Sequence, residues 1–289
     1  MDINRRNFFK VMGATGATLA LGSELQARPK KGADTEFYGV LYDSVRCIGC
    51  YNCEYECASA HGLPEPVIPA EDTQVRKPDE TWRTVVNGYE TSKGKVYVKQ
   101  QCMHCNEPAC AAACLTQAMY KTEEGPVIWR GNKCMGCRYC MVSCPFDSPK
   151  FEYFSANPKI NKCTMCFEEK VKQGGIPACV EFCSGDALMF GPRRELIKEA
   201  RRRIAEQPDV YYDHIYGEHE AGGTGWLYLS PVPFEELGLR TGIQRDSYPA
   251  LTKGFLYSVP TVFIAVPALL LGIQQATSKN QTNPENEDE

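Results

Sequence analysis

The residues best able to do chemistry in this chain are its cysteines. There are sixteen, and they fall into four groups of four with none left over. Two groups share the spacing C-x2-C-x2-C-x3-C, and the other two contain longer internal gaps. In chain order the groups are Cys47, Cys50, Cys53 and Cys57; Cys102, Cys105, Cys110 and Cys114; Cys134, Cys137, Cys140 and Cys144; and Cys163, Cys166, Cys179 and Cys183.

The spacing of the first and third groups is typical of ligands to [4Fe–4S] cubanes. A C-x2-C-x2-C loop curls around one cubane and presents three thiolates to three irons, and Gly49 and Gly136 ease the tight turns. Three further residues place the last cysteine on the helix that leaves the loop. It faces away from that cubane and so ligates the other cluster of a pair. The cysteines therefore predict four [4Fe–4S] clusters, each with three ligands from one group and one from another.

Zinc sites and disulfides are the alternatives to iron–sulfur clusters. Zinc sites use pairs of cysteines separated by a spacer, rather than runs of three closely spaced cysteines with a fourth on a helix. A C-x2-C-x2-C run cannot satisfy disulfide geometry for three thiols within itself. Four complete groups favour iron–sulfur clusters, and a structural zinc or disulfide protein stays the alternative of another class.

Other polar side chains carry weaker predictions. Arg46, Lys133 and Lys162 each precede the first cysteine of a group, where they could raise a cluster's reduction potential or simply be surface charge. Four histidines show no ligand spacing, and we expect them to be structural: His61, His104, His214 and His219. The sequence has no P-loop, dinucleotide-binding fingerprint, nucleophile elbow or metalloprotease motif. We therefore expect a protein that moves electrons and has no catalytic residues of its own.

The segments between the cysteine groups predict the elements that position them. Residues 82–100 predict a strand, a turn at Asn87-Gly88 and a second strand that delivers the chain to Cys102. Pro192 opens a predicted helix. Its apolar face consists of Leu196, Ile197, Ala200 and Ile204. Its basic residues at 198 and 201–203 could bind a partner or lipid head groups, but a solvated helix face is favoured.

Residues 1–27 resemble a twin-arginine export signal. Arg5 and Arg6, followed by Phe8, Phe9 and Lys10, precede an uncharged stretch over 11–22 that is too short to span a bilayer. Cleavage after residue 27 and retention of the signal both stay open. This route exports folded proteins. Clusters can therefore be inserted in the reducing cytoplasm, which reconciles export with a cysteine-rich chain.

A second apolar segment lies near the C-terminus. Residues 254–278 contain no charge, and the stretch over 255–273 would extend about 28 Å as a helix, close to the hydrocarbon thickness of a bilayer. Pro260 and Pro267 would kink such a helix, which membrane helices tolerate better than soluble ones. We predict one transmembrane helix over 254–275 and an acidic tail over 276–289 on the cytoplasmic side. The orientation rests on the export signal alone.

Composition excludes several other classes of protein. The net charge of −4 and a pI near 5.7 speak against nucleic-acid binding. A mean hydropathy of −0.37 excludes a polytopic membrane protein. Hydrophobic and charged contents of 43% and 24% exclude wholesale disorder.

Four cysteine groups in this order, followed by one apolar span, resemble the iron–sulfur electron-transfer subunits of membrane-bound respiratory oxidoreductases. That family includes formate dehydrogenase beta subunits, the ferredoxin-like subunit of dimethyl sulfoxide reductase and the iron–sulfur subunit of periplasmic hydrogenase-2-type nickel–iron hydrogenases. The hydrogenase subunit is the nearest resemblance, through LYDSVRCIGC, KQQCMHCNEPAC, GCRYCMVSCPF and HIYGEHEAGGTGWLYLSPVPFEELGL. A proline after the last cysteine, common in the family, occurs here only at Pro145.

The resemblance implies an α+β fold of two interleaved ferredoxin-like lobes, each with two [4Fe–4S] clusters, and a single C-terminal transmembrane helix. The outer lobe would comprise residues 28–98 and 146–250, and the inner lobe residues 99–145. The family pairs the first cysteine group with the fourth and the second with the third. The implied ligand sets are Cys47, Cys50 and Cys53 with Cys183; Cys163, Cys166 and Cys179 with Cys57; Cys102, Cys105 and Cys110 with Cys144; and Cys134, Cys137 and Cys140 with Cys114.

The resemblance also implies partners and a location. The subunit would lie on the periplasmic side of the inner membrane, anchored by its helix in the lipid bilayer. It would relay electrons between a nickel–iron hydrogenase and an integral membrane quinone-reactive subunit. The alternative is the beta subunit of a molybdenum or tungsten enzyme such as formate dehydrogenase, with the same clusters and another electron source. No nucleic-acid partner is expected.

Overall fold

A computed structural model describes residues 37–69 and 74–278. The predicted export signal and residues 279–289 of the predicted tail lie outside the described residues. The described residues fall within one compact unit, and the boundaries of the two lobes stay a prediction. The helices and strands are β1 (Tyr38–Asp43), α2 (Asn52–His61), β2 (Val85–Thr91), β3 (Gly94–Gln100), α3 (Ala109–Ala112), β4 (Met119–Lys121), β5 (Val127–Trp129), η1 (Gly131–Lys133), α4 (Tyr139–Val142), β6 (Lys150–Phe151), β7 (Ile160–Asn161), η2 (Val171–Gln173), α5 (Ala178–Glu181), β8 (Leu188–Pro192), α6 (Arg193–Glu206), η3 (Glu220–Gly222), β9 (Trp226–Leu229), η4 (Phe234–Leu237) and α7 (Tyr248–Ser278).

A three-stranded sheet in the order β8-β1-β9 joins the beginning of the described chain to its later part. Strand β1 runs antiparallel to β8 and parallel to β9, so that Val40 lies opposite Phe190 and Trp226. Successive side chains of a strand point to opposite faces. Val40 and Tyr42 accordingly belong to one buried cluster and Leu41 to another. The sheet is therefore covered on both faces.

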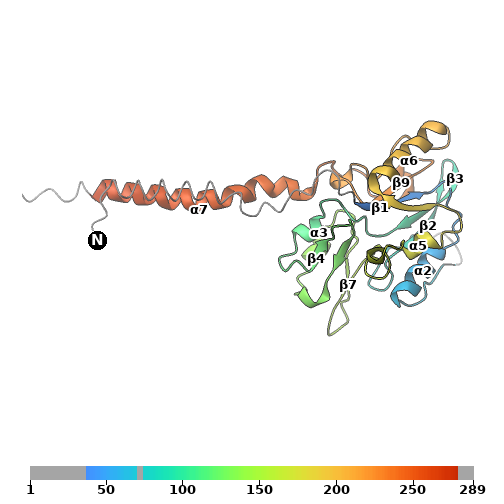
Figure 1. Cartoon of the computed structure of the whole chain (residues 1–289), viewed down its shortest axis with the longest axis horizontal. Helices are drawn as coiled ribbons and strands as arrows, with labels where there is room; N and C mark the ends of the chain where they lie inside the picture. Colours follow the sequence, from blue (N-terminus) through green and yellow to red (C-terminus); the bar gives the residue numbers. More distant parts are fainter. Residues whose placement is uncertain (1–36, 70–73, 279–289) are drawn as a thin grey trace, which may run out of the picture. The chain divides into compact units, whose positions relative to one another are not determined.

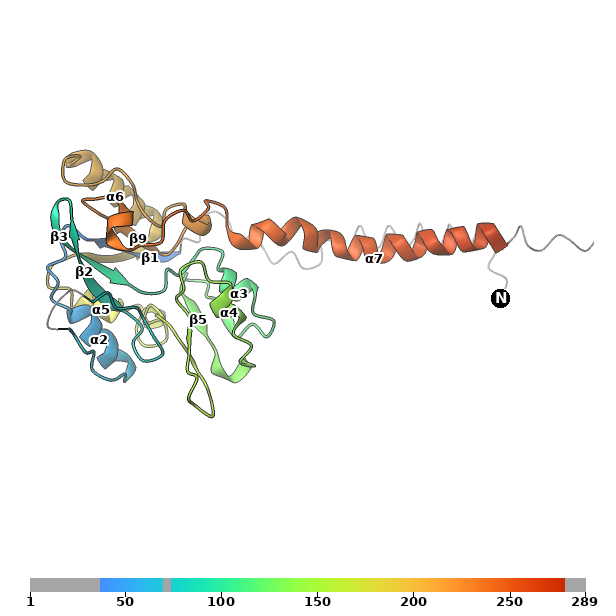
Figure 2. The same ribbon diagram turned by 180° about the vertical axis from the view of Figure 1, so that it is seen from behind.

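Helix α6 covers the Leu41 face of this sheet (Figures 1 and 2). The predicted helix is confirmed: Pro192 stands at its N-cap, Leu196 and Ala200 are buried, and the two isoleucines of its apolar face pack against the same cluster. The expectation of a solvated basic face is wrong for Arg203. Its Nη1 donates to Oδ2 of the buried Asp43 at 2.8 Å, because the last turn of α6 lies over the end of β1.

Strands β2 and β3 form the predicted hairpin, but the predicted turn is misplaced. Asn87 and Gly88 lie inside β2, opposite Val98 and Tyr97 of β3, and the turn falls at residues 92–93. The Asn87 side chain has another role. It accepts a hydrogen bond from the backbone N–H of Arg76 and donates one to its carbonyl, both at 2.8 Å. Strand β3 delivers the chain to Cys102, as predicted.

The cysteine groups lie among short elements. Helix α2 packs against α5, although about 120 residues separate them in the sequence, and α3 packs against α4. These neighbours can be followed in Figures 1 and 2. Two small hairpins, β4-β5 and β6-β7, lie between the later cysteine groups. Each helix pair therefore joins segments that carry different cysteine groups.

Helix α7 contains the predicted apolar span. Within the described chain it is the one helix long and apolar enough to cross a membrane, over Tyr248–Gln275, with a mean hydropathy of 2.0 and none of its apolar window buried. The helix continues through Pro260 and Pro267. The expectation of one candidate C-terminal span is confirmed, and its bounds at 254–275 stay a prediction.

Candidate iron–sulfur sites

Four loops that share one backbone feature present the cysteines. In each loop the residue two positions after the first cysteine is left-handed: Gly49 (φ 67°), His104 (φ 49°), Gly136 (φ 73°) and Met165 (φ 56°). A positive φ is uncommon outside glycine. Its recurrence at equivalent positions of all four loops, twice without glycine, indicates one shared turn that curls each group around a common centre.

One such centre combines the fourth cysteine group with a single thiol from the first cysteine group. Burial raises the pKa of the Cys57 thiol well above its ordinary value, and the next cause is Cys163, followed among the thiols by Cys179 and Cys166. Cys57 lies on α2 and Cys179 on α5. The packing of these two helices therefore brings thiols more than 100 residues apart into electrostatic contact.

The remaining thiols of the first group have a different neighbour. Burial raises the pKa of Cys47, and the nearby Cys183 and Cys50 raise it further. Burial also raises the pKa of Cys53, where the thiol causes are Cys179 and Cys47. The structure thus places Cys183 beside the first group. This centre adjoins the Cys57 centre through Cys53 and Cys179, which lie near each other.

The last cysteines of the second and third groups each lie near thiols of the other group. The pKa of Cys105 is raised by burial and then by Cys102 and Cys144. Burial raises the pKa of Cys140 to about 11, with Cys114 the first thiol to contribute. The structure therefore brings together thiols from each of the four ligand sets implied by the sequence. Their assignment as cluster ligands is a proposal, developed below.

The donor set fits iron–sulfur clusters better than the alternatives. All sixteen cysteines lie within the described residues, and none forms a disulfide. Within the described parts of the chain, no three histidine, cysteine or acidic side chains lie close enough to hold one metal ion. Zinc at about 2.3 Å from each sulfur would need thiols about 3.8 Å apart. A cubane binds each thiolate through a different iron, so its four thiols stand farther apart.

A buried lysine lies among the outer thiols. Lys99, which is 1% exposed, donates through Nζ to the Thr84 hydroxyl and to Oε1 of Gln101, and lies 5.0 Å from the ring centroid of Trp226. Burial lowers the pKa of Lys99, but surrounding thiols outweigh this and raise it overall. These thiols are Cys179, Cys53, Cys163 and Cys57. A cation so placed offsets the negative charge of two neighbouring thiolate sets.

His61 departs from the expectation that the histidines are structural. Its Nε2 lies 3.5 Å from Sγ of Cys166 and its Nδ1 donates to Glu169 at 2.9 Å, with the ring side chain 2% exposed. The hydrogen bond from His61 is the main cause that lowers the pKa of Glu169. The sequence did contain a pointer: His61 follows Cys57 by four residues on α2, so both lie on one helix face.

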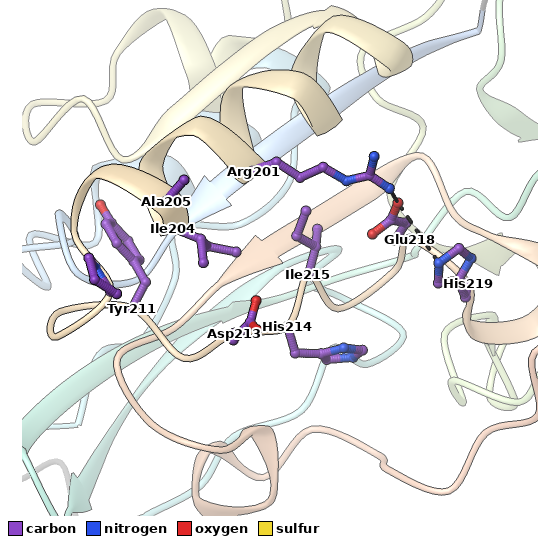
Figure 3. A pocket seen from close by; sticks show the side chains of 10 residues that line it. Arg201, Ile204, Ala205, Tyr211, Asp213, His214, Ile215, Glu218 and His219 are labelled. Carbon is purple, nitrogen blue, oxygen red and sulfur yellow. Dashed lines mark hydrogen bonds and ion pairs between the residues drawn. The ribbon is translucent and has the colours of Figure 1, made fainter.

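The contacts found for the other histidines are with groups other than cysteine sulfur. His104 is fully buried and its Nδ1 accepts the Val127 N–H at 2.8 Å. Burial, together with two nearby lysines, holds its pKa well below the usual range. His214 and His219 lie at an open cavity of about 590 Å³ beside α6 (Figure 3). Arg201 and Glu218 form an ion pair at its side. This cavity contains no cysteine.

These features define a ferredoxin-like iron–sulfur protein, and comparison with known proteins places it more closely. Residues 94–193 match the family model described as a 4Fe-4S dicluster domain. A protein of Nitratidesulfovibrio vulgaris (strain Hildenborough) is 42% identical over 96% of this chain and 78% of its own length. The hydrogenase-2 operon protein HybA of Escherichia coli O157:H7 is 33% identical over 97% of both chains. The iron–sulfur subunit of the nitrate-inducible formate dehydrogenase of E. coli K12 is 31% identical over 80% of this chain and 82% of its own length.

The chain belongs to the family of [4Fe–4S] electron-transfer subunits that contains these two enterobacterial proteins. Its sixteen cysteines, at four per cubane, correspond to four [4Fe–4S] clusters. The predicted family, fold class, cofactor and electron-transfer role are confirmed, and the zinc or disulfide alternative is wrong.

Proposed function

We propose that this subunit relays electrons between a nickel–iron hydrogenase and a quinone-reactive membrane subunit, and has no substrate site of its own. The observation that carries the hydrogenase assignment is the match to HybA over 97% of both chains. The match to the formate dehydrogenase subunit covers less of each chain, and a molybdenum or tungsten enzyme is the second candidate partner.

The exposure of the cysteines supports a relay with two ends. Of the sixteen, Cys50 and Cys137 are exposed and the others are buried or half-buried. These two belong to different proposed ligand sets, one in the outer pair of clusters and one in the inner pair. Electron exchange with partners requires a cluster near the surface, whereas transfer within the chain requires clusters close to one another.

The proposed ligands follow the groups that share electrostatic contact. One cluster is held by Cys47, Cys50, Cys53 and Cys183, and its neighbour by Cys57, Cys163, Cys166 and Cys179. The inner clusters are held by Cys102, Cys105, Cys110 and Cys144 and by Cys114, Cys134, Cys137 and Cys140. Iron and acid-labile sulfide analysis of anaerobically purified protein tests the number of clusters, with about sixteen irons per chain expected. Zinc in place of iron contradicts it.

The proposed location is the periplasmic side of the inner membrane, with α7 as the anchor. The apolar span supports the anchor, and the twin-arginine sequence supports export of the folded body. Alkaline extraction of membranes and protease protection in spheroplasts test both parts. We expect the protein to stay with the membrane and its body to be digested from outside. Recovery in the soluble fraction, or full protection, contradicts the location.

The partner is tested in membranes of the native host. Deletion of this chain is expected to abolish hydrogen-dependent reduction of a quinone analogue but to preserve hydrogen-dependent reduction of benzyl viologen. The dye takes electrons directly from a catalytic subunit. Loss of formate-dependent quinone reduction, with hydrogen oxidation intact, would instead identify the second candidate as the partner.

A further inference from the structure

The three basic residues that stand immediately before a cysteine group differ in how deeply they are buried. Arg46 has a side chain 46% exposed and lies near Asp43, and Lys133 is exposed at the end of η1. Lys162 is only 3% exposed, directly after β7. The same sequence position therefore carries a surface charge in two groups and a buried charge in one.

The ammonium group of Lys162 is fixed in place by its partners. Nζ donates to the carbonyl oxygens of Cys163, at 2.7 Å, and of Val127, and it lies 3.7 Å from Sγ of Cys102. An ammonium has three protons to donate. Three acceptors surround it, so the charge is held against a proposed cluster ligand and away from solvent.

Lys162 lies where the outer and inner ligand sets meet. Cys163 belongs to the proposed outer set with Cys57, and Cys102 to the proposed inner set with Cys144. The Lys162 ammonium contacts both residues, the Cys163 carbonyl oxygen at 2.7 Å and the Cys102 sulfur at 3.7 Å. It therefore touches a sulfur of the inner set and only a backbone carbonyl of the outer set.

We propose that Lys162 is a positioning residue that raises the reduction potential of the cluster held by Cys102, Cys105, Cys110 and Cys144. A reduced cubane carries one more negative charge, and a buried cation beside its thiolate stabilises that charge in a medium of low dielectric constant. The inference rests on the proposed electron relay. In the step it favours, one electron leaves the Cys57 cluster and enters this neighbour, with no bond broken and no proton moved.

Potentiometric titration followed by EPR tests the proposal on the full-length, iron-loaded chain. Lys162→Gln removes the charge, and Lys133→Gln is the matched control because Lys133 holds the equivalent sequence position on the surface. We expect full iron in both variants. One of the four midpoint potentials of Lys162→Gln should fall by the equivalent of a tenfold change in the equilibrium constant, about 59 mV for one electron. Lys133→Gln should keep all four. Unchanged potentials in Lys162→Gln, or the same shift in the control, overturn the proposal.

A third variant covers the case in which Lys162→Gln fails to assemble its clusters. Lys162→Arg keeps the charge, and full iron with wild-type potentials in that protein supports the proposal. Loss of iron in Lys162→Arg as well shows that the side chain fills space rather than supplies charge, and overturns it. Wild-type protein without iron overturns the electron relay itself, which separates the two failures.

Discussion

Two of the proposed ligand sets have the same four donors in opposite surroundings. The buried set (Cys57, Cys163, Cys166 and Cys179) has every cysteine buried, whereas in the exposed set (Cys114, Cys134, Cys137 and Cys140) none is buried. The pKa of Cys57 is raised well above its ordinary value, mainly by burial. Burial acts in the same direction at Cys114, but backbone and side-chain hydrogen bonds outweigh it and lower the pKa.

This comparison shows that ligand spacing does not decide a cluster's environment. The loops of both sets have a left-handed residue at the same position, two after the first cysteine. The buried set nevertheless lies against packed helices and buried lysines, whereas the exposed set lies at the surface. Reduction potentials depend on solvent exposure and on hydrogen bonds to sulfur. Clusters with equal ligands are therefore expected to differ in potential, and the buried set is suited to passing electrons inward.

Removal of one ligand from each set gives the largest expected effect. Cys57→Ala should lose its cluster, about four irons, and should also destabilise the fold, because Cys57 joins α2 to segments more than 100 residues away. Cys137→Ala should lose iron from the exposed set with little further loss of stability. Iron content and the thermal midpoint measure both. Equal loss of stability in the two variants contradicts the distinction between the sets.

The ion pair at the end of β1 is the next largest effect. Arg203→Met removes the buried guanidinium partner of the Asp43 carboxylate, which keeps only the half-exposed Arg46 guanidinium at 3.6 Å, and should lower the free energy of unfolding by about 3 kcal/mol. Arg202→Met is the control, since Arg202 is 53% exposed and solvent screens its ion pairs, so its removal should change stability little. Denaturant titration in detergent measures both. A small effect at Arg203 would mean that β1, which leads to the first cysteine group, does not depend on this pair.

The contact between His61 and Cys166 is expected to have a moderate effect on the buried set alone. An iron-bound thiolate has no proton, so Nε2 must donate to it, and because Nδ1 donates to Glu169 this contact requires protons on both ring nitrogens. Its loss in His61→Leu should destabilise the reduced cluster by about 1 kcal/mol, which lowers the reduction potential by about 40 mV. EPR-monitored titration measures the shift, with His214→Leu as the control distant from any cysteine. A shift of equal size in His214→Leu would count against the contact.

The smallest effect concerns helix α6, which covers the sheet beside the buried region. The hydrogen bond from Arg202, followed by that from Arg203, lowers the pKa of Glu199 to about 2 from an ordinary value of 4.5. A lowered folded-state pKa stabilises the fold above pH 4.5, and this stabilisation is lost as the pH falls toward 2. After solvent screening we expect a loss of about 0.5 kcal/mol. Glu199→Gln should reduce this acid sensitivity, measured by unfolding at pH 5 and pH 3.

Helix capping and turn preferences predicted which local elements form, but they did not always predict the positions of those elements. The helix opened by Pro192 was predicted with its apolar face because that pattern is local. The hairpin was predicted, but its turn was placed five residues too early, since Asn87-Gly88 has the preferred turn residues. Long-range bonds to Arg76 draw Asn87 into the strand, and no local pattern reveals them.

The sequence by itself determined the donors, their grouping, the cofactor class and the family, because cubane ligands must follow a fixed spacing and thiols have few other uses in such runs. It also determined the apolar span, since that depends on composition and length. Only the tertiary structure decided how closely thiols of different groups approach one another, which lysine is buried and which histidine contacts sulfur. Lys133 and Lys162 occupy the same motif position, but Lys133 is a surface charge and Lys162 is buried. The difference arises because residues distant in sequence pack around Lys162.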